Sequence, residues 1–210
     1  MRPFGSHTLS LFAGATISAL AGALFAPQPH GVTPQQQQIL NMLTLETPPE
    51  TGGTTTVRLT GANFQIVNGL GQTQTNNGVG NLIVGYNELG NVYGQGDVRT
   101  GSHTIVCGEQ NSYSTYGGIA AGMSNSILGV FSSSVGGLGN TSSGSYAACL
   151  GGGINTASGS GATCLGGALN TASGAQARCS GGLFNVASGQ FASTLGGTNN
   201  SAVNLLSITP

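Results

Sequence analysis

Residues 151–195 carry the clearest pattern in the chain: GGGINTASGSGATCL, GGALNTASGAQARCS and GGLFNVASGQFASTL, three successive units of fifteen residues. Gly-Gly pairs in the same phase also begin at Gly136 and Gly196, and an asparagine follows the second glycine of each pair by three residues. A short fixed period with small residues at fixed positions is the sequence signature of a solenoid. The sequence therefore predicts an all-β fold, a parallel β-solenoid or β-roll with coils of 14–15 residues.

The same rule extends towards the N-terminus with a slightly shorter spacing. Gly108 is followed by Asn111 and Gly122 by Asn125, so we expect regular repeats over residues 104–202. One asparagine per coil then stacks into a ladder along the rod. The predicted ladder consists of Asn111, Asn125, Asn140, Asn155, Asn170, Asn185 and Asn200.

Alternation within the repeat predicts which side chains point inward. In the first strand of each unit, the position of Thr163 is occupied by Arg178 one unit later, and a charged side chain must reach solvent. The alternating alanines and cysteines therefore face inward, which predicts a second ladder of Cys149, Cys164 and Cys179. In the second strand Asn and Ala face inward, and Thr and Ser face outward. A buried asparagine is costly unless it is hydrogen-bonded, so we expect bonds along the stack.

Several apolar residues fall on the outward face. Strands that are apolar on both faces are normally buried on both faces. A coil of fifteen residues has no further layer of its own, so another chain must cover this face, and thin rods side by side favour a closed homotrimer. The expected subunit interface contains Leu82, Val84, Ile105, Val135, Leu150, Leu165 and Leu195.

Charge is nearly absent from the chain. Only 4% of the residues are charged, there is no lysine, and the net charge is -1. This argues against nucleic acid and anionic membranes as partners, because both need a basic surface. Beyond Glu109 the only charged residue is Arg178. General acid–base catalysis needs titratable groups, so we expect no catalytic residues, no cofactor and a non-enzymatic role.

The few titratable groups elsewhere predict little chemistry. His103, Glu109, Asp97 and Glu88 lie in the less regular first half, where a solvated loop cluster is the simplest interpretation. Metal binding is not expected, because the sequence has no CxxC motif and no histidine beside the cysteines. Free buried thiols are the main expectation for the cysteines, and an inter-chain or stacked disulfide is the alternative.

The N-terminal part divides into short segments. Residues 1–26 have the pattern of a signal peptide, with a retained apolar segment as the alternative. Residues 27–50 contain a linker and a short helix over 35–45, started by Thr33 and Pro34, which either packs on the body or pairs with copies of itself. Residues 51–103 form an irregular β region with strands expected at 54–61 and 63–69, and residues 203–210 form a C-terminal tail.

The repeats resemble a known family. The runs SSVGG, TCLGG and STLGG, with the Asn-x-Ala-Ser-Gly motifs at 155–159, 170–174 and 185–189, look like the head domain of trimeric autotransporter adhesins. The resemblance implies a left-handed, trimeric parallel β-roll on a bacterial surface. The chain departs from the pattern by carrying Gly-Gly where that family favours Ile-Gly, and we expect a head module without the family's stalk and C-terminal membrane anchor.

Three functions follow as expectations. The first is a secreted or cell-surface structural or adhesive rod, which mediates attachment or assembly through copies of itself and an unknown surface ligand. The second is a subunit of a self-stacking extracellular filament. The third is an ice- or carbohydrate-binding solenoid that uses the outward row Thr141, Thr156 and Thr171. No membrane contact is expected for the mature rod unless the N-terminal segment is retained.

Overall fold

The computed structural model describes residues 31–210, so the expected signal peptide or apolar segment at 1–26 lies outside the described residues. The described chain divides into two units, one that ends at Phe64 and one that spans Gln65–Pro210. Within residues 31–210, no helix is both long and apolar enough to cross a membrane.

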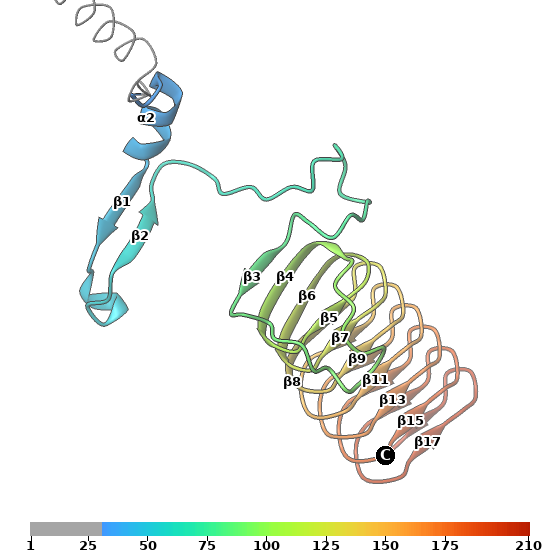
Figure 1. The fold of residues 1–210 in the computed structure, drawn as a ribbon. Helices are drawn as coiled ribbons and strands as arrows, with labels where there is room; N and C mark the ends of the chain where they lie inside the picture. The colour runs from blue at the N-terminus through green and yellow to red at the C-terminus, as the bar shows by residue number, and fades with distance from the viewer. Residues whose placement is uncertain (1–30) are drawn as a thin grey trace, which may run out of the picture. The chain divides into compact units, whose positions relative to one another are not determined.

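The first unit contains a short helix and a β-hairpin (Figure 1). Thr33 starts the helix as expected: its hydroxyl oxygen accepts from the Gln36 backbone N–H at 3.2 Å, and the Gln36 side chain accepts from the Thr33 N–H at 2.7 Å. Across the hairpin, the Arg58 guanidinium forms ion pairs with the carboxylates of Glu46 at 2.7 Å and Glu50 at 3.2 Å. The elements are α2 (Pro34–Asn41), β1 (Leu43–Glu46), η1 (Pro49–Thr51) and β2 (Thr56–Leu59).

The predicted helix over 35–45 is wrong in its second half. The helix ends at Asn41, and Leu43–Glu46 forms the strand β1, which pairs antiparallel with β2. The helix buries none of its residues. Most helical stability comes from packing of an apolar face, so nothing holds the remaining residues helical, and strand pairing satisfies their backbone groups instead. The strand expected at 54–61 is present as β2, whereas 63–69 contains no strand.

The second unit is a parallel β-solenoid of flattened coils, as the repeats predicted (Figure 1). Each regular coil contributes one strand to each of two sheets, and every strand pairs in parallel with the equivalent strand one coil away. In β12 (Thr163–Cys164), for example, Thr163 pairs with Ala148 one coil before and with Arg178 one coil after. The coil length therefore sets the register, since residues fifteen apart become neighbours.

The two sheets have nine and seven strands. The nine-stranded sheet runs in the order β3 (Leu82–Val84), β4 (Ser102–Glu109), β6 (Tyr116–Met123), β8 (Ser133–Leu138), β10 (Ala148–Cys149), β12 (Thr163–Cys164), β14 (Arg178–Cys179), β16 (Ser193–Thr194) and β18 (Ile208–Thr209). The seven-stranded sheet runs β5 (Ser112–Tyr113), β7 (Ser126–Ile127), β9 (Thr141–Ser142), β11 (Thr156–Ala157), β13 (Thr171–Ala172), β15 (Val186–Ala187) and β17 (Ser201–Ala202).

The solenoid extends beyond the boundaries expected from the repeats. β3 lies in the segment expected to be irregular, yet it pairs in register with β4, so Leu82 lies beside Ile105. At the other end, β18 lies in the segment expected to be a tail, and it pairs with β16. The array therefore begins one strand earlier than the repeat motif and includes residues 208–209.

The core between the two sheets is made of small residues. Ala162 and Cys164 from one sheet and Ala172 from the other are fully buried, whereas Thr163 is half-buried and Arg178 is exposed. The predicted inward and outward positions of both strands are confirmed. Small side chains suit this core because the two strands of one coil lie close together. Nearer the first coils, larger residues (Val106, Tyr113 and Ile127) form a second cluster.

Candidate functional site

The asparagine ladder runs through the interior of the solenoid. Asn170 shows the pattern: its backbone N–H donates to the Asn155 Oδ1 at 3.0 Å, and its own Oδ1 accepts from the Asn185 N–H at 2.9 Å. Its Nδ2 donates to the carbonyls of Gly166 in the same coil and Gly182 in the next, both at 3.0 Å. The side chains of the interior asparagines are therefore satisfied by bonds that repeat once per coil, as the sequence required.

The ladder begins one coil earlier than its sequence motif. Asn87 is buried, and its Oδ1 accepts from the Asn111 N–H at 2.7 Å while its Nδ2 donates to the Asn111 carbonyl at 3.1 Å. Asn87 does not fit the repeat rule, because 24 residues separate it from Asn111 and it follows Gly85 by two residues instead of three. The shared Ile-Val pair in NLIVGYN and HTIVCGEQN is the signal that could have revealed it.

The three ladder cysteines stack in register inside the nine-stranded sheet. Cys149 pairs with Cys164 and Cys164 with Cys179, and all three are free thiols with no exposed surface. Each thiol donates to a carbonyl of the opposite sheet, as from Cys164 to Thr156 at 3.3 Å. Hydrogen bonds to Cys149 and Cys179, together with burial, raise the pKa of the central Cys164 thiol above its ordinary value. These thiols fill the core.

The reactivity of the thiols tests whether the interior of the solenoid is closed to solvent. We expect at most one thiol per chain, that of the exposed Cys107, to react with a chromogenic disulfide reagent in the folded protein, and all four to react after unfolding in guanidinium. Only an accessible thiolate attacks a disulfide quickly. Fast reaction of Cys107→Ser would contradict the buried ladder, because this variant retains only the three interior thiols.

The seven residues of the expected interface lie on the outward side of the nine-stranded sheet, and we call this set the apolar stripe. In the regular coils one row passes through Val135, Leu150, Leu165 and Leu195. In the first coils the same side carries Leu82, Val84 and Ile105. All seven residues are between 38% and 60% exposed, so the described chain leaves each of them partly uncovered. The structure therefore aligns these seven residues on one side of the sheet, from β3 at one end to the coil of β16 near the other.

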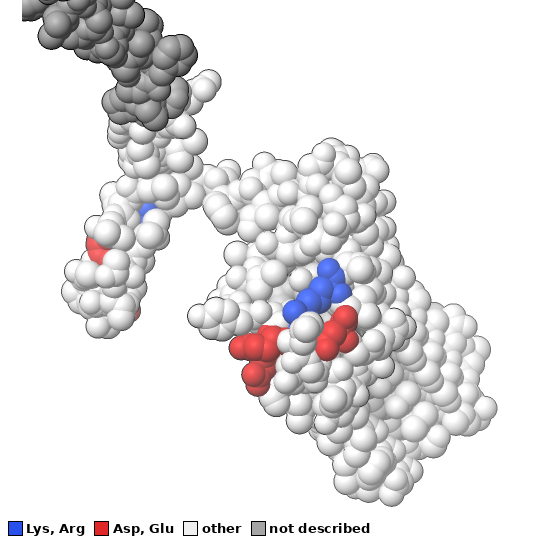
Figure 2. Space-filling view, in the orientation of Figure 1, with Lys and Arg blue, Asp and Glu red and all other residues white. Residues whose placement is uncertain are grey.

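Charged residues of the solenoid gather near its first coils (Figure 2). Asp97 pairs with Arg99 at 3.7 Å and accepts from the Gly90 N–H at 2.9 Å, and Arg99 donates to the Glu88 carbonyl at 2.6 Å. His103 lies apart from them, bonded to the Thr73 carbonyl at 3.0 Å and to the Asn68 N–H at 3.3 Å. These groups hold loops in place. In residues 31–210, no three His, Cys, Asp or Glu side chains are grouped to hold a metal.

The comparisons with known proteins add no assignment. No protein-family model, no curated protein and no solved structure matches this chain. The β-solenoid is shown by the structure itself, through the parallel pairing of its strands.

Proposed function

We propose that this protein is a non-catalytic structural or adhesive rod that associates with copies of itself through the apolar stripe. The observation that carries the proposal is the stripe, which aligns large apolar side chains along one side of a solenoid whose own core is complete. Burial of a leucine contributes about 1.5–3 kcal/mol. The leucines of the stripe are about half exposed, so each can still gain part of this amount against a flat apolar partner. The row contains Leu150, Leu165 and Leu195 with Ser180 between the last two, and a second copy carries the same row.

The near-absence of ionisable groups supports a contact role over catalysis. Along the coils after Glu109, the only charged side chain is Arg178, so no acid–base pair can form there. The other outward positions combine Ser, Thr and Gly with exposed apolar side chains such as Ile154, Leu169 and Phe184, which gives a neutral surface suited to contacts. The resemblance of the repeats to the heads of trimeric autotransporter adhesins supports a trimer at a cell surface as the finer proposal.

Light scattering on the full chain tests the self-association. We expect a mass of three chains at micromolar concentration, and a single chain for Leu165→Asp, because burying an unpaired carboxylate in the interface is costly. Thr156→Asp is the matched control, since Thr156 faces outward on the seven-stranded sheet. A wild-type protein that remains a monomer would refute the trimer, and long uniform fibres in electron micrographs would favour the filament instead.

Cys107 gives an independent measurement of the same contact. It lies in the row of the stripe, where it pairs with Val84 and Ala121. We expect its thiol to react at least tenfold more slowly in the assembled wild type than in Leu165→Asp, because the interface excludes the reagent. Equal rates in the two proteins would place the contact elsewhere.

A further inference from the structure

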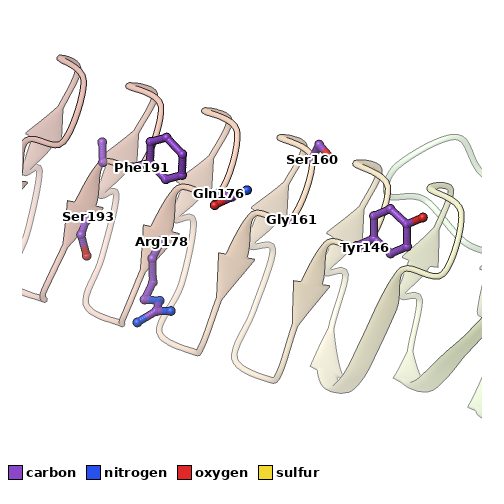
Figure 3. Close-up of a pocket in the computed structure, with 8 residues that line it drawn as sticks. Tyr146, Ser160, Gly161, Gln176, Arg178, Phe191 and Ser193 are labelled. Atoms are coloured by element: carbon purple, nitrogen blue, oxygen red, sulfur yellow. The ribbon is translucent and has the colours of Figure 1, made fainter.

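One corner of the solenoid carries a hollow that spans four coils. The hollow has a volume of about 820 Å³. Figure 3 shows the rings of Tyr146 and Phe191 at its two ends, with Gln176 between them and Arg178 on its strand below. Gly161, Ser160, Ala192 and Ser193 complete the lining. We call this site the corner notch.

The notch exists because a glycine interrupts a row of large side chains. The turn before each strand of the nine-stranded sheet from β8 to β18 places one residue at the same corner, and these six residues have a positive φ between 55° and 67°. At one end of the row the rings of Phe131 and Tyr146 stack at 5.9 Å. The next residue is Gly161, so the opposite ring face of Tyr146 has no ring beside it. The row consists of Phe131, Tyr146, Gly161, Gln176, Phe191 and Leu206.

The backbone does not require glycine at this position. Tyr146 and Gln176, its two neighbours in the row, adopt a positive φ with full side chains. A non-glycine residue in this conformation costs about 1 kcal/mol or more. From Phe131 onward the row therefore presents large side chains at an energetic cost and omits one at Gly161, which opens a gap of two coil spacings, about 10 Å, between Tyr146 and Gln176. At Gly117, the equivalent position one coil before Phe131, the Phe131 ring occupies the space that a side chain would take.

The notch also holds the one charge of the regular coils. Arg178 is exposed, and its guanidinium has no ion-pair partner among residues 31–210. The row to which it belongs carries Ala148, Thr163 and Ser193 in the neighbouring coils, so the strand itself does not need an arginine. A planar guanidinium binds a carboxylate or a sulfate through two parallel hydrogen bonds.

We propose that the corner notch binds a short oligosaccharide that carries a single acidic group. The electron-rich faces of Tyr146 and Phe191 attract the polarised C–H face of a sugar ring. Their separation of three coils, about 14 Å, matches a short oligosaccharide better than one sugar. Arg178 holds the carboxylate or sulfate, and Gln176 and Ser193 supply hydrogen bonds to hydroxyl groups.

The charge count favours this ligand over a nucleic acid. Single-stranded nucleic acids also stack on aromatic rings, but their binding requires a basic groove that follows the phosphates. The notch offers one cation on a rod that is otherwise neutral after Glu109, so additional ligand charges would find no partner. A ligand with one anion among neutral sugars fits this arrangement.

The site deepens the proposed adhesive function but does not depend on self-association. The notch lies at the turn that contains Gly161, and the stripe in the regular coils lies at the other end of the same strands, beside the Gly-Gly turns. Ser193 of the notch and Leu195 of the stripe are two residues apart on the same outward face. Light scattering on each notch variant therefore accompanies the binding measurement, so that a change in the assembly is distinguished from loss of the ligand.

The test applies the full chain to an array of immobilised neutral, carboxylated, sulfated and polyanionic glycans, with single-stranded DNA as a further spot. We expect retention by glycans with one acidic group. Titration of the best-retained glycan should show a loss of about tenfold to a hundredfold for Arg178→Thr, the cost of a charge-assisted hydrogen bond. Gly161→Gln should weaken binding similarly by filling the gap, and Arg178→Lys should lose less than Arg178→Thr.

Gly196→Ser is the matched control, because a Cβ at Gly196 meets no atom within 4 Å and lies outside the notch. Light scattering and circular dichroism on each variant separate loss of the ligand site from loss of the assembly or the fold. The proposal is overturned by no glycan binding, by equal binding of neutral glycans, by preference for DNA or polyanions, or by binding that Arg178→Thr leaves intact. Glycan binding by a monomeric wild type would refute the trimer alone.

Discussion

Asn170→Ala is expected to destabilise the solenoid by about 3 kcal/mol or more. Truncation leaves the buried Asn185 N–H without its acceptor, and an orphaned buried donor costs about 1–3 kcal/mol. It also removes the bonds to the carbonyls of Gly166 and Gly182 and leaves a cavity in a packed interior, which adds to the cost. In a solenoid, stability depends on nearest-neighbour interfaces, so the defect weakens the coils on both of its sides.

Urea unfolding followed by circular dichroism measures this effect, with Asn200→Ala as the matched control. Asn200 is only half-buried, and its Nδ2 donates to Gly196 alone. We expect it to cost about 1 kcal/mol or less. Equal losses of unfolding free energy in Asn170→Ala and Asn200→Ala would contradict this prediction. They would mean that the additional hydrogen bonds of the buried Asn170 do not contribute to stability.

Gly167→Ala is expected to destabilise the solenoid strongly, although it adds a single methyl group. A Cβ at Gly167 would lie 2.1 Å from the Gly182 carbonyl oxygen and 2.7 Å from the Asn170 Nδ2. The backbone φ of +73° adds the penalty of a left-handed residue, about 1–2 kcal/mol. Both neighbours belong to the ladder and cannot move independently, so we expect a loss of more than about 3 kcal/mol.

The adjacent glycine provides the control within the same dipeptide. A Cβ at Gly166 meets no atom within 4 Å, and its φ is outside the left-handed region. Gly166→Ala should therefore be neutral, or stabilising by about 0.4–1 kcal/mol through a smaller entropy of the unfolded chain. Thermal unfolding of the two variants distinguishes the roles. A midpoint for Gly167→Ala within a degree or two of that for Gly166→Ala would show that the coils are not packed as closely as the structure indicates.

Much of the solenoid could be predicted from the sequence because its determinants repeat. The inward positions of Cys164 and Ala172 followed from alternation, and the exposure of Leu150 and Leu165 followed from their phase relative to Arg178. Each position was supported by several equivalent coils. The residues of the apolar stripe could therefore be named, although their contact with a second chain is a proposal.

The predictions from sequence are wrong or incomplete where the repeat offers no such support. The helix after Thr33 was extended through Leu45 because its apolar spacing suits a helix, but strand pairing with β2 overrides this weak local preference. Asn87 was missed because an insertion separates it from the next ladder residue. The corner notch was not recognised because its residues belong to four different coils.

The sequence by itself determined the period, the inside and outside of each coil and the scarcity of charge, because these properties are local and repeated. The tertiary structure alone decided where the array begins, how the Asn87 side chain joins the ladder and which exceptional residues become neighbours. Arg178 and Gly161 are isolated departures from the repeat when the chain is followed in one dimension. Stacking the coils places them beside Tyr146 and Phe191, because parallel pairing converts a spacing of fifteen residues into contact between adjacent strands.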